Sequence, residues 1–329
     1  MRYTLIGVVA LVFVLPFSAS AQSFNTMGAT SNSFTISSSP QYPVPYGQAV
    51  LSFLSSSLDL ANATMTVFAN GSQVYAGNVQ SISITLGKPG SVTTIDVNVS
   101  SAGAQYSQSL TIQPQDVSLI AEPIASTPVL YPGKPSVPIN GSTRIVAIAN
   151  LVGSGGAIDP ATLSYSWVVD GTRIANSSGI GKDALVVASP LQYRIRSVSV
   201  VVQDQAGTLV GGASLTLSAS EPSVRLYVND PLLGIRYDRA LVGTYTIPGS
   251  EASLFAAPFS LPLSAGAPVL QWFLDGSSAQ SGSLITLRPS GSGQGSASLS
   301  LTASAGAAEV TANLSLSFGA APSSNFFGL

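Results

Sequence analysis

Histidine and cysteine are both absent from this chain of 329 residues, and only 8% of its residues are charged. Without histidine, the chain lacks the side chain that most often serves as a general base and as a metal ligand. Without cysteine it can form no disulfide, so hydrophobic packing must supply the stability. Any active site would depend on a few carboxylates and basic residues. We therefore expect a protein that is not an enzyme and that holds no cofactor or metal ion.

The charge is also sparse in its arrangement. A net charge of −2 argues against a nucleic-acid surface, which needs clustered lysine and arginine. Only two pairs of basic residues lie close together in the sequence, Arg194 with Arg196 and Arg236 with Arg239. We interpret both pairs as solvated strand or loop residues, with an anion site as the alternative. The many small, hydroxyl-bearing and β-branched residues predict β-structure with a neutral outer face.

The N-terminus has the three parts of a secretory signal peptide. Met1 and Arg2 form a short basic segment, residues 5–17 are almost wholly apolar, and residues 18–21 offer a cleavage site between small residues. We predict a signal peptide over residues 1–21 and a mature protein outside the cytoplasm, at the cell surface, in the periplasm or secreted. An uncleaved N-terminal anchor is the alternative. It is the only membrane attachment that we expect, because no second apolar stretch of spanning length follows.

A repeated pattern organises the rest of the chain. A large apolar residue stands four positions before a glycine that follows Asn or Asp: Val67 before Gly71, Trp167 before Gly171, and Trp272 before Gly276. Asn-Gly and Asp-Gly predict a hairpin turn, because both turn residues must tolerate positive φ. Later in each copy, apolar residues alternate on both sides of a second glycine (Gly103, Gly207, Gly306), which predicts another hairpin with one buried face.

Short polar segments with proline, at 113–116 and 220–222, separate the copies. Each copy has about a hundred residues, enough for an independent β-sandwich core. Because the linkers are so short, we expect neighbouring domains to touch and to flex little, as in a semi-rigid rod.

The middle copy carries Tyr165, Trp167 and Asp170-Gly171, and then alternating valines before Asp204 and Gly207. In this it resembles the polycystic-kidney-disease-type (PKD) repeat, an immunoglobulin-like sandwich. The resemblance implies that Trp167 lies in the core and that residues 204–207 form the turn after strand F. The third copy lacks the second aspartate of this pattern, and the first copy lacks both that aspartate and the tryptophan.

The segment 221–234 and the aromatic residues at 325–329 also resemble exported multi-Ig-like proteins of small-genome, uncultivated bacteria. That resemblance implies a cell-surface or envelope setting, near surface fibres or pili. We predict an all-β chain of three tandem immunoglobulin-like (PKD-type) β-sandwich domains after the signal peptide. The domains span residues 22–116, 117–219 and 220–319, and an apolar tail follows at 320–329.

Few residues qualify for a site. We interpret Asp170 and Asp275 as turn residues rather than acids, because each precedes a glycine. Asp204, Asp230 and Asp238 could meet at a domain junction and bind calcium, although the sequence contains no calcium-loop motif.

The tail carries the only residues that we assign to binding, Phe326, Phe327 and Leu329. Exposed apolar clusters tend to be used for contact, so we predict a docking peptide for a partner. The alternative is that the tail folds back onto the third domain or frays.

Together these features predict a non-enzymatic, exported surface or envelope protein that acts as a structural spacer and adhesive module. Its partner would be a protein or a glycan, and exposed edge strands could bind a partner by strand addition. The alternative function is a glycan- or cell-wall-polymer-binding module, with Tyr42, Tyr46 and Tyr131 as a stacking platform.

Overall fold

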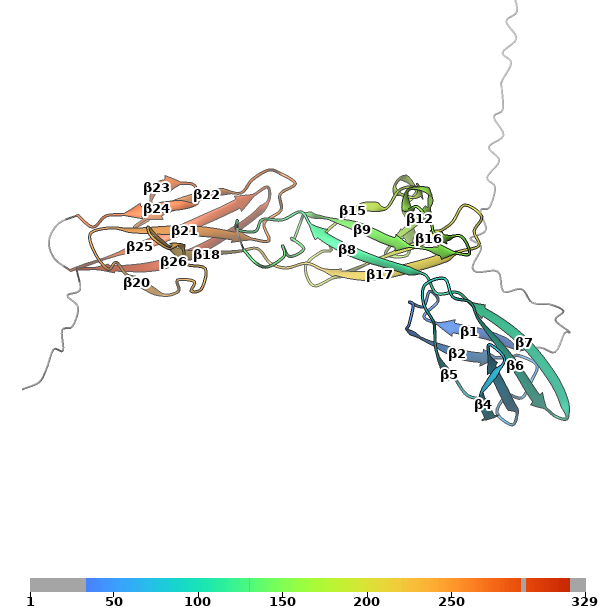
Figure 1. Cartoon of the computed structure of the whole chain (residues 1–329). Coiled ribbons are helices and arrows are strands. Elements are labelled where there is room, and N and C mark those ends of the chain that lie inside the picture. The colour runs from blue at the N-terminus through green and yellow to red at the C-terminus, as the bar shows by residue number, and fades with distance from the viewer. Residues whose placement is uncertain (1–33, 130, 291–293, 320–329) are drawn as a thin grey trace, which may run out of the picture. The chain divides into compact units, whose positions relative to one another are not determined.

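Antiparallel ladders make up nearly all of the regular structure. The computed structural model describes residues 34–129, 131–290 and 294–319 (Figure 1). This part of the chain contains strands and two single-turn 3-10 helices, η1 (Pro160–Thr162) and η2 (Ala175–Ser177). The all-β prediction is confirmed. Within the same residues, no helix has the length and apolar character needed to cross a membrane. The predicted signal peptide and tail lie outside the described residues.

The chain divides into two compact units. The first contains residues 34–39, 49–84 and 92–112, and the second contains residues 40–48, 85–91 and the described residues from 113 onward. Two separate hydrophobic cores lie in the second unit, one built from residues between 117 and 217 and the other from residues between 224 and 316. The domain boundaries at 116 and 219 stay a prediction.

The first sandwich has sheets of order β1-β2-β5 and β4-β3-β6-β7. Its strands are β1 (Thr35–Ser39), β2 (Gln48–Leu54), β3 (Thr64–Ala69), β4 (Ser72–Asn78), β5 (Ile82–Thr85), β6 (Thr93–Ser101) and β7 (Ala104–Ile112). Every second residue of β6 is buried, so one face of this strand belongs to the core. The first, second and fifth strands share one sheet and the other four share the second, as in an immunoglobulin-like sandwich.

The second sandwich repeats this order with β15-β9-β8 facing β13-β12-β16-β17, and β14 also pairs with β12. Its strands are β8 (Asp116–Pro123), β9 (Ser142–Asn150), β12 (Ser164–Val169), β13 (Thr172–Arg173), β14 (Gly179–Ile180), β15 (Ala184–Ala188), β16 (Ile195–Gln203) and β17 (Val210–Ser218). A small hairpin of β10 (Val152–Gly153) and β11 (Gly156–Ala157) lies between β9 and η1.

The third sandwich has sheets of order β19-β18-β21-β24 and β20-β26-β25-β22-β23. Its strands are β18 (Ser223–Asp230), β19 (Gly234–Ile235), β20 (Thr244–Thr246), β21 (Ala252–Phe259), β22 (Val269–Leu274), β23 (Ser277–Ser281), β24 (Leu284–Leu287), β25 (Gly295–Ala305) and β26 (Ala308–Phe318). The short strand β20 pairs in parallel with β26. The chain therefore leaves one sheet at the end of β18 and joins the opposite sheet at β20.

Each of the three predicted Asn-Gly and Asp-Gly turns is held by the same pair of hydrogen bonds, which we call the clasp. The residue before the glycine has a positive φ in each: 49° at Asn70, 49° at Asp170 and 48° at Asp275. Its N–H donates to a carbonyl on the neighbouring long strand, and its side-chain oxygen accepts the N–H of that same residue. The distances are 2.8 and 2.9 Å for Asn70 with Thr94, 2.9 and 2.9 Å for Asp170 with Ser197, and 2.8 and 2.7 Å for Asp275 with Ser298.

The two tryptophans occupy equivalent places in the second and third cores. Both are 0% exposed, which agrees with the core position implied for Trp167. Each indole N–H donates to a carbonyl, Trp167 to Lys182 at 2.9 Å and Trp272 to Gly282 at 2.8 Å. A buried indole needs such an acceptor, since an unpaired N–H would carry its full desolvation cost. Val67 fills the same place in the first sandwich without a polar atom and is also 0% exposed.

The clasp predicts a contrast between two substitutions at one position. Asp275→Ala removes the acceptor for the Ser298 N–H and puts a residue without a local hydrogen bond at positive φ, so we expect a loss of about 1–2 kcal/mol of unfolding free energy. Asp275→Asn should remain close to the parent protein, because Asn tolerates this conformation and serves the same role at position 70. Urea unfolding of the two variants would measure the difference, and equal losses would contradict the clasp.

Candidate functional site

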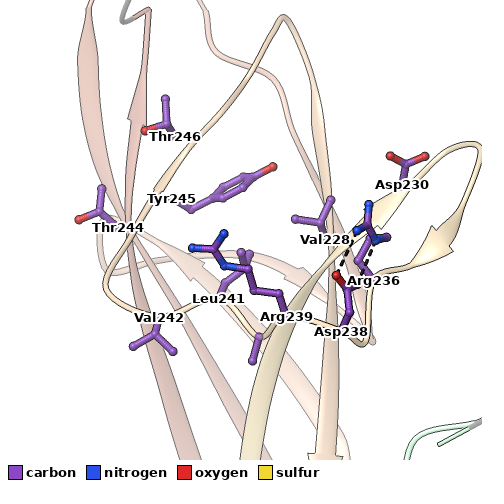
Figure 2. Close-up of a pocket in the computed structure, with 11 residues that line it drawn as sticks. Val228, Asp230, Arg236, Asp238, Arg239, Leu241, Val242, Thr244, Tyr245 and Thr246 are labelled. Carbon is purple, nitrogen blue, oxygen red and sulfur yellow. Dashed lines mark hydrogen bonds and ion pairs between the residues drawn. The ribbon is translucent and has the colours of Figure 1, made fainter.

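A surface cavity of about 410 Å³ lies in the third sandwich, where the chain crosses from β18 to β20 (Figure 2). The end of β18 supplies Val228 and Asp230, and β20 supplies its three residues Thr244–Thr246. The rest of the wall comes from the connecting segment, residues 236 and 238–242. We call this space the Arg239 cavity.

Local hydrogen bonds hold the connecting segment against β18. The Asp230 carboxylate accepts the N–H groups of Leu232 at 2.8 Å and Leu233 at 2.9 Å, which turns the chain back after β18. On the return path, the N–H of Arg236 donates to the carbonyl of Val228 at 2.9 Å. Further on, the N–H of Leu241 donates to the carbonyl of Leu226 at 2.8 Å. The cavity wall is therefore tied to a core strand rather than carried on a free loop.

Two of the charged side chains at the cavity neutralise each other. Arg236 donates from Nε to Oδ1 and from Nη2 to Oδ2 of Asp238, both at 3.0 Å, as the dashed lines in Figure 2 show. The hydrogen bond from Arg236 lowers the pKa of Asp238, and the same pair raises the pKa of Arg236. The backbone N–H groups of Leu233 and Leu232 lower the pKa of Asp230. Both carboxyl groups are therefore ionised at neutral pH.

Arg239 differs from Arg236. Within the described residues, its guanidinium has no hydrogen bond or ion pair with protein. The Tyr245 hydroxyl at the same cavity likewise has no protein partner among these residues, and partial burial raises the pKa of Tyr245. Val228 and Leu241 pack against the core and form an apolar floor. The cavity thus combines unused donors with an aromatic ring and apolar carbons.

The two basic pairs have different surroundings. Arg196 donates to Asp170 at 3.0 Å and to the carbonyl of Ala188 at 2.6 Å, so it belongs to the clasp region of the second sandwich. Arg236 and Arg239 both line the cavity. For this pair, the alternative interpretation as an anion site stays a prediction. No pattern in the sequence indicates that Tyr245 belongs to a site. Its place depends on the parallel pairing of β20 with β26, about seventy residues away, and no local pattern signals that pairing.

The three aspartates considered for calcium do not form one group. Asp230 and Asp238 line the Arg239 cavity, where both already have protein partners. Asp204 lies in the turn between β16 and β17 and accepts the N–H groups of Thr208 at 2.7 Å and Leu209 at 2.9 Å. Among the described residues, no cluster of three or more acidic side chains is placed to hold a metal ion.

The three tyrosines proposed as a stacking platform have separate environments. Tyr46 is 71% exposed, whereas Tyr42 is half-buried and burial raises its pKa. Tyr131 packs edge-on against Phe259, with ring centroids 5.1 Å apart. The predicted binding residues Phe326, Phe327 and Leu329 lie outside the described residues.

No protein-family model matches the sequence, and no curated protein matches it. Several solved structures align with most of this chain at low TM-scores. Three N-terminal domains of the Highly Immunogenic Outer Capsid protein of bacteriophage RB49 align with 87% of this chain and 98% of that chain, at 13% identity and a TM-score of 0.25. The central fibronectin-III array of RIM-binding protein aligns with 85% of this chain and 95% of that chain, at 9% identity and a TM-score of 0.28.

A third similar structure is SGBP-B of the Bacteroides ovatus mixed-linkage glucan utilization locus, in complex with a mixed-linkage heptasaccharide. The alignment with SGBP-B covers 88% of this chain and 71% of the SGBP-B chain, at 14% identity and a TM-score of 0.20. Alignments with TM-scores this low carry no argument about what this chain binds.

The Asp204 turn predicts a dependence of stability on pH. Desolvation raises the pKa of Asp204, but the hydrogen bonds from Leu209, Thr208 and Gly207 together outweigh it and lower the pKa below its ordinary value. The turn should therefore add stability above the unfolded-state pKa of about 3.9 and lose it as pH falls through the lower folded-state pKa. Urea unfolding of Asp204→Asn and the parent protein from pH 7 to pH 2 should show a difference that shrinks with acid. A difference that is constant with pH would contradict this role.

Proposed function

We propose that this chain is an exported, non-enzymatic surface or envelope protein whose tandem immunoglobulin-like domains act as a structural spacer and adhesive module. The proposal includes the signal peptide over 1–21, domains at 22–116, 117–219 and 220–319, and a setting near surface fibres or pili. The observation that carries the spacer role is a hydrogen-bonded joint between the two sandwiches of the second unit.

One buried serine forms the centre of this joint. Ser126 follows β8 of the second sandwich and meets the segment after β21 of the third. Its N–H donates to the carbonyl of Leu261 at 2.8 Å, and its carbonyl accepts the N–H of Ser260 at 3.0 Å. Its hydroxyl accepts the N–H of Leu261 at 3.0 Å, and Ser126 is only 6% exposed. Three hydrogen bonds at one buried residue resist sliding and twisting between the two sandwiches.

Further contacts extend the joint on both sides. The Tyr237 hydroxyl of the third sandwich donates to the carbonyl of Val129 at 3.1 Å. The ring contact between Tyr131 and Phe259 adds apolar area. On the incoming linker, the N–H of Ser220 donates to the carbonyl of Val137 at 2.8 Å. These contacts have to break before one sandwich can turn against the other, which supports a spacer.

The state of the carboxylates supports the non-enzymatic part of the proposal. Asp170 and Asp275 are used in clasps, Asp204 organises a turn, and Asp238 is paired with Arg236. A general acid or base needs a carboxyl that is free to exchange a proton with substrate. The chain contains no histidine to replace them.

The joint predicts a selective effect of removing one hydroxyl. Ser126→Ala leaves the buried N–H of Leu261 without its side-chain acceptor, so we expect a loss of about 1–3 kcal/mol in unfolding free energy of the second unit. Small-angle X-ray scattering should also show a wider distribution of distances. Ser214→Ala, at an exposed position of β17, is the matched control and should change neither measurement. Equal behaviour of the two variants would contradict a stabilising joint.

The adhesive part of the proposal concerns the tail. Deleting residues 320–329 removes Phe326, Phe327 and Leu329, so we expect less protein to remain with washed cells, because the apolar docking contact is lost. The control replaces the same ten residues by a Gly/Ser segment of equal length and should behave like the deletion. Unchanged retention would contradict the docking role. Unchanged retention with a lower unfolding midpoint would show instead that the tail packs on its own chain.

A further inference from the structure

We infer that the Arg239 cavity binds a uronic-acid residue of a polysaccharide, with Arg239 holding the sugar carboxylate. This inference rests on the proposed role of the chain as an interaction module and adds a ligand class and a site to it. The described residues that carry it are Arg239, Tyr245 and Asp230, together with the apolar floor of the cavity.

Arg239 supplies the cation that a sugar carboxylate needs. A guanidinium presents five donors in a planar fork that matches a carboxylate in a bidentate pair. Arg236 already uses this fork on Asp238, with two bonds of 3.0 Å. The guanidinium of Arg239 lines the same cavity and makes no such bond within the described part of the chain. It is therefore the group available for an incoming anion (Figure 2).

The cavity also offers partners for the hydroxyl groups of a sugar. A sugar ring both donates and accepts hydrogen bonds, so its site needs acceptors as well as donors. Asp230 accepts its two backbone N–H groups through Oδ1 alone, which leaves Oδ2 for a ligand hydroxyl. The Tyr245 and Thr244 hydroxyls supply further donors or acceptors at the same wall. An acidic peptide side chain would use only the donors of this set.

The Tyr245 ring and the apolar floor of the cavity offer a surface for the face of a sugar ring. Tyr245 is half-buried on β20, and Val228 and Leu241 are half-buried against the core. Such surfaces suit the C–H face of a sugar, while a few placed polar groups set its orientation. Arg239 acts on Asp238 by charge alone, and a neutral sugar on this floor would give its guanidinium no bidentate partner. The complete set therefore favours a sugar that carries a carboxylate.

The corresponding segment of the second sandwich has another use. After β8, Ser126 and Val129 take part in the joint, and Val137 further on accepts the N–H of Ser220. In the third sandwich the segment between β18 and β20 lines the Arg239 cavity, and its contact with the joint is made by Tyr237, which does not line the cavity. The donors at this cavity are thus not needed for a joint.

The test measures binding of a galacturonic acid tetramer to the mature full-length chain by isothermal titration calorimetry at low ionic strength. Arg239→Gln should weaken binding by about tenfold or more, because the bidentate pair is lost. Arg288→Gln is the matched control: it removes an exposed arginine of the same sandwich that pairs with Glu251 at 2.6 Å, and it should leave binding unchanged. Tyr245→Phe, which keeps the ring, should weaken binding by about two- to fivefold.

Two further probes identify the ligand class. A cellulose tetramer, which is neutral, should bind at least about tenfold more weakly than the uronate, and a Glu-rich peptide should not compete. The inference is overturned if the parent chain does not bind the uronate, if Arg239→Gln and Arg288→Gln bind alike, or if the peptide or the neutral sugar binds as well. Unfolding midpoints of all variants show that they are folded. Failure here with a positive tail and joint test would remove this site and leave the proposed function intact.

Discussion

Each sandwich depends on a turn residue that is held at positive φ and hydrogen-bonded twice to the long strand beside it. Asn70, Asp170 and Asp275 occupy the same place in the three copies, and each fixes the entry of its hairpin against the strand that carries the core alternation. Where a tryptophan stands three positions earlier, its indole N–H is also bonded to a carbonyl. At this hairpin, the turn conformation, the packing of the core and the pairing of buried polar groups therefore favour the same structure. The chain has no disulfides to add to them.

This constraint has a consequence for function. An aspartate that both accepts a backbone N–H and sets the turn cannot also serve as a catalytic acid without loss of the fold. Asp159, Asp204 and Asp230 also accept backbone N–H groups in turns, and Asp238 is paired with Arg236. Within the part of the chain that the structure describes, the Arg239 guanidinium has no hydrogen bond to protein, which leaves its donors free for the ligand proposed above.

Local sequence predicted those features whose causes are local. The Asn-Gly and Asp-Gly pairs predicted the turns, and alternating valines predicted the long hairpins, because strand period and positive φ are properties of a few adjacent residues. The cavity and the joint could not be predicted in this way. Tyr245 lines the cavity because three residues of β20 pair with β26, and Ser126 is buried because it meets Leu261, 135 positions away. Such contacts depend on which segments the folded sheets bring together.

The parallel pairing of β20 with β26 also matters under mechanical load. A pull at both ends of the third sandwich acts first on β18, where the chain enters, and on its pairing with β21. Once β18 has detached, the load draws β20 and β26 in opposite directions along their own axes. The pairs Thr244–Ser315, Tyr245–Leu316 and Thr246–Ser317 are then strained together in shear. The additional hydrogen bond between the hydroxyls of Thr246 and Ser317, at 2.8 Å, shares the force. Bonds that must break at once resist tension better than bonds that open one after another. The parallel pairing of β20 with β26 therefore opposes extension of the third sandwich by shear rather than by one bond at a time.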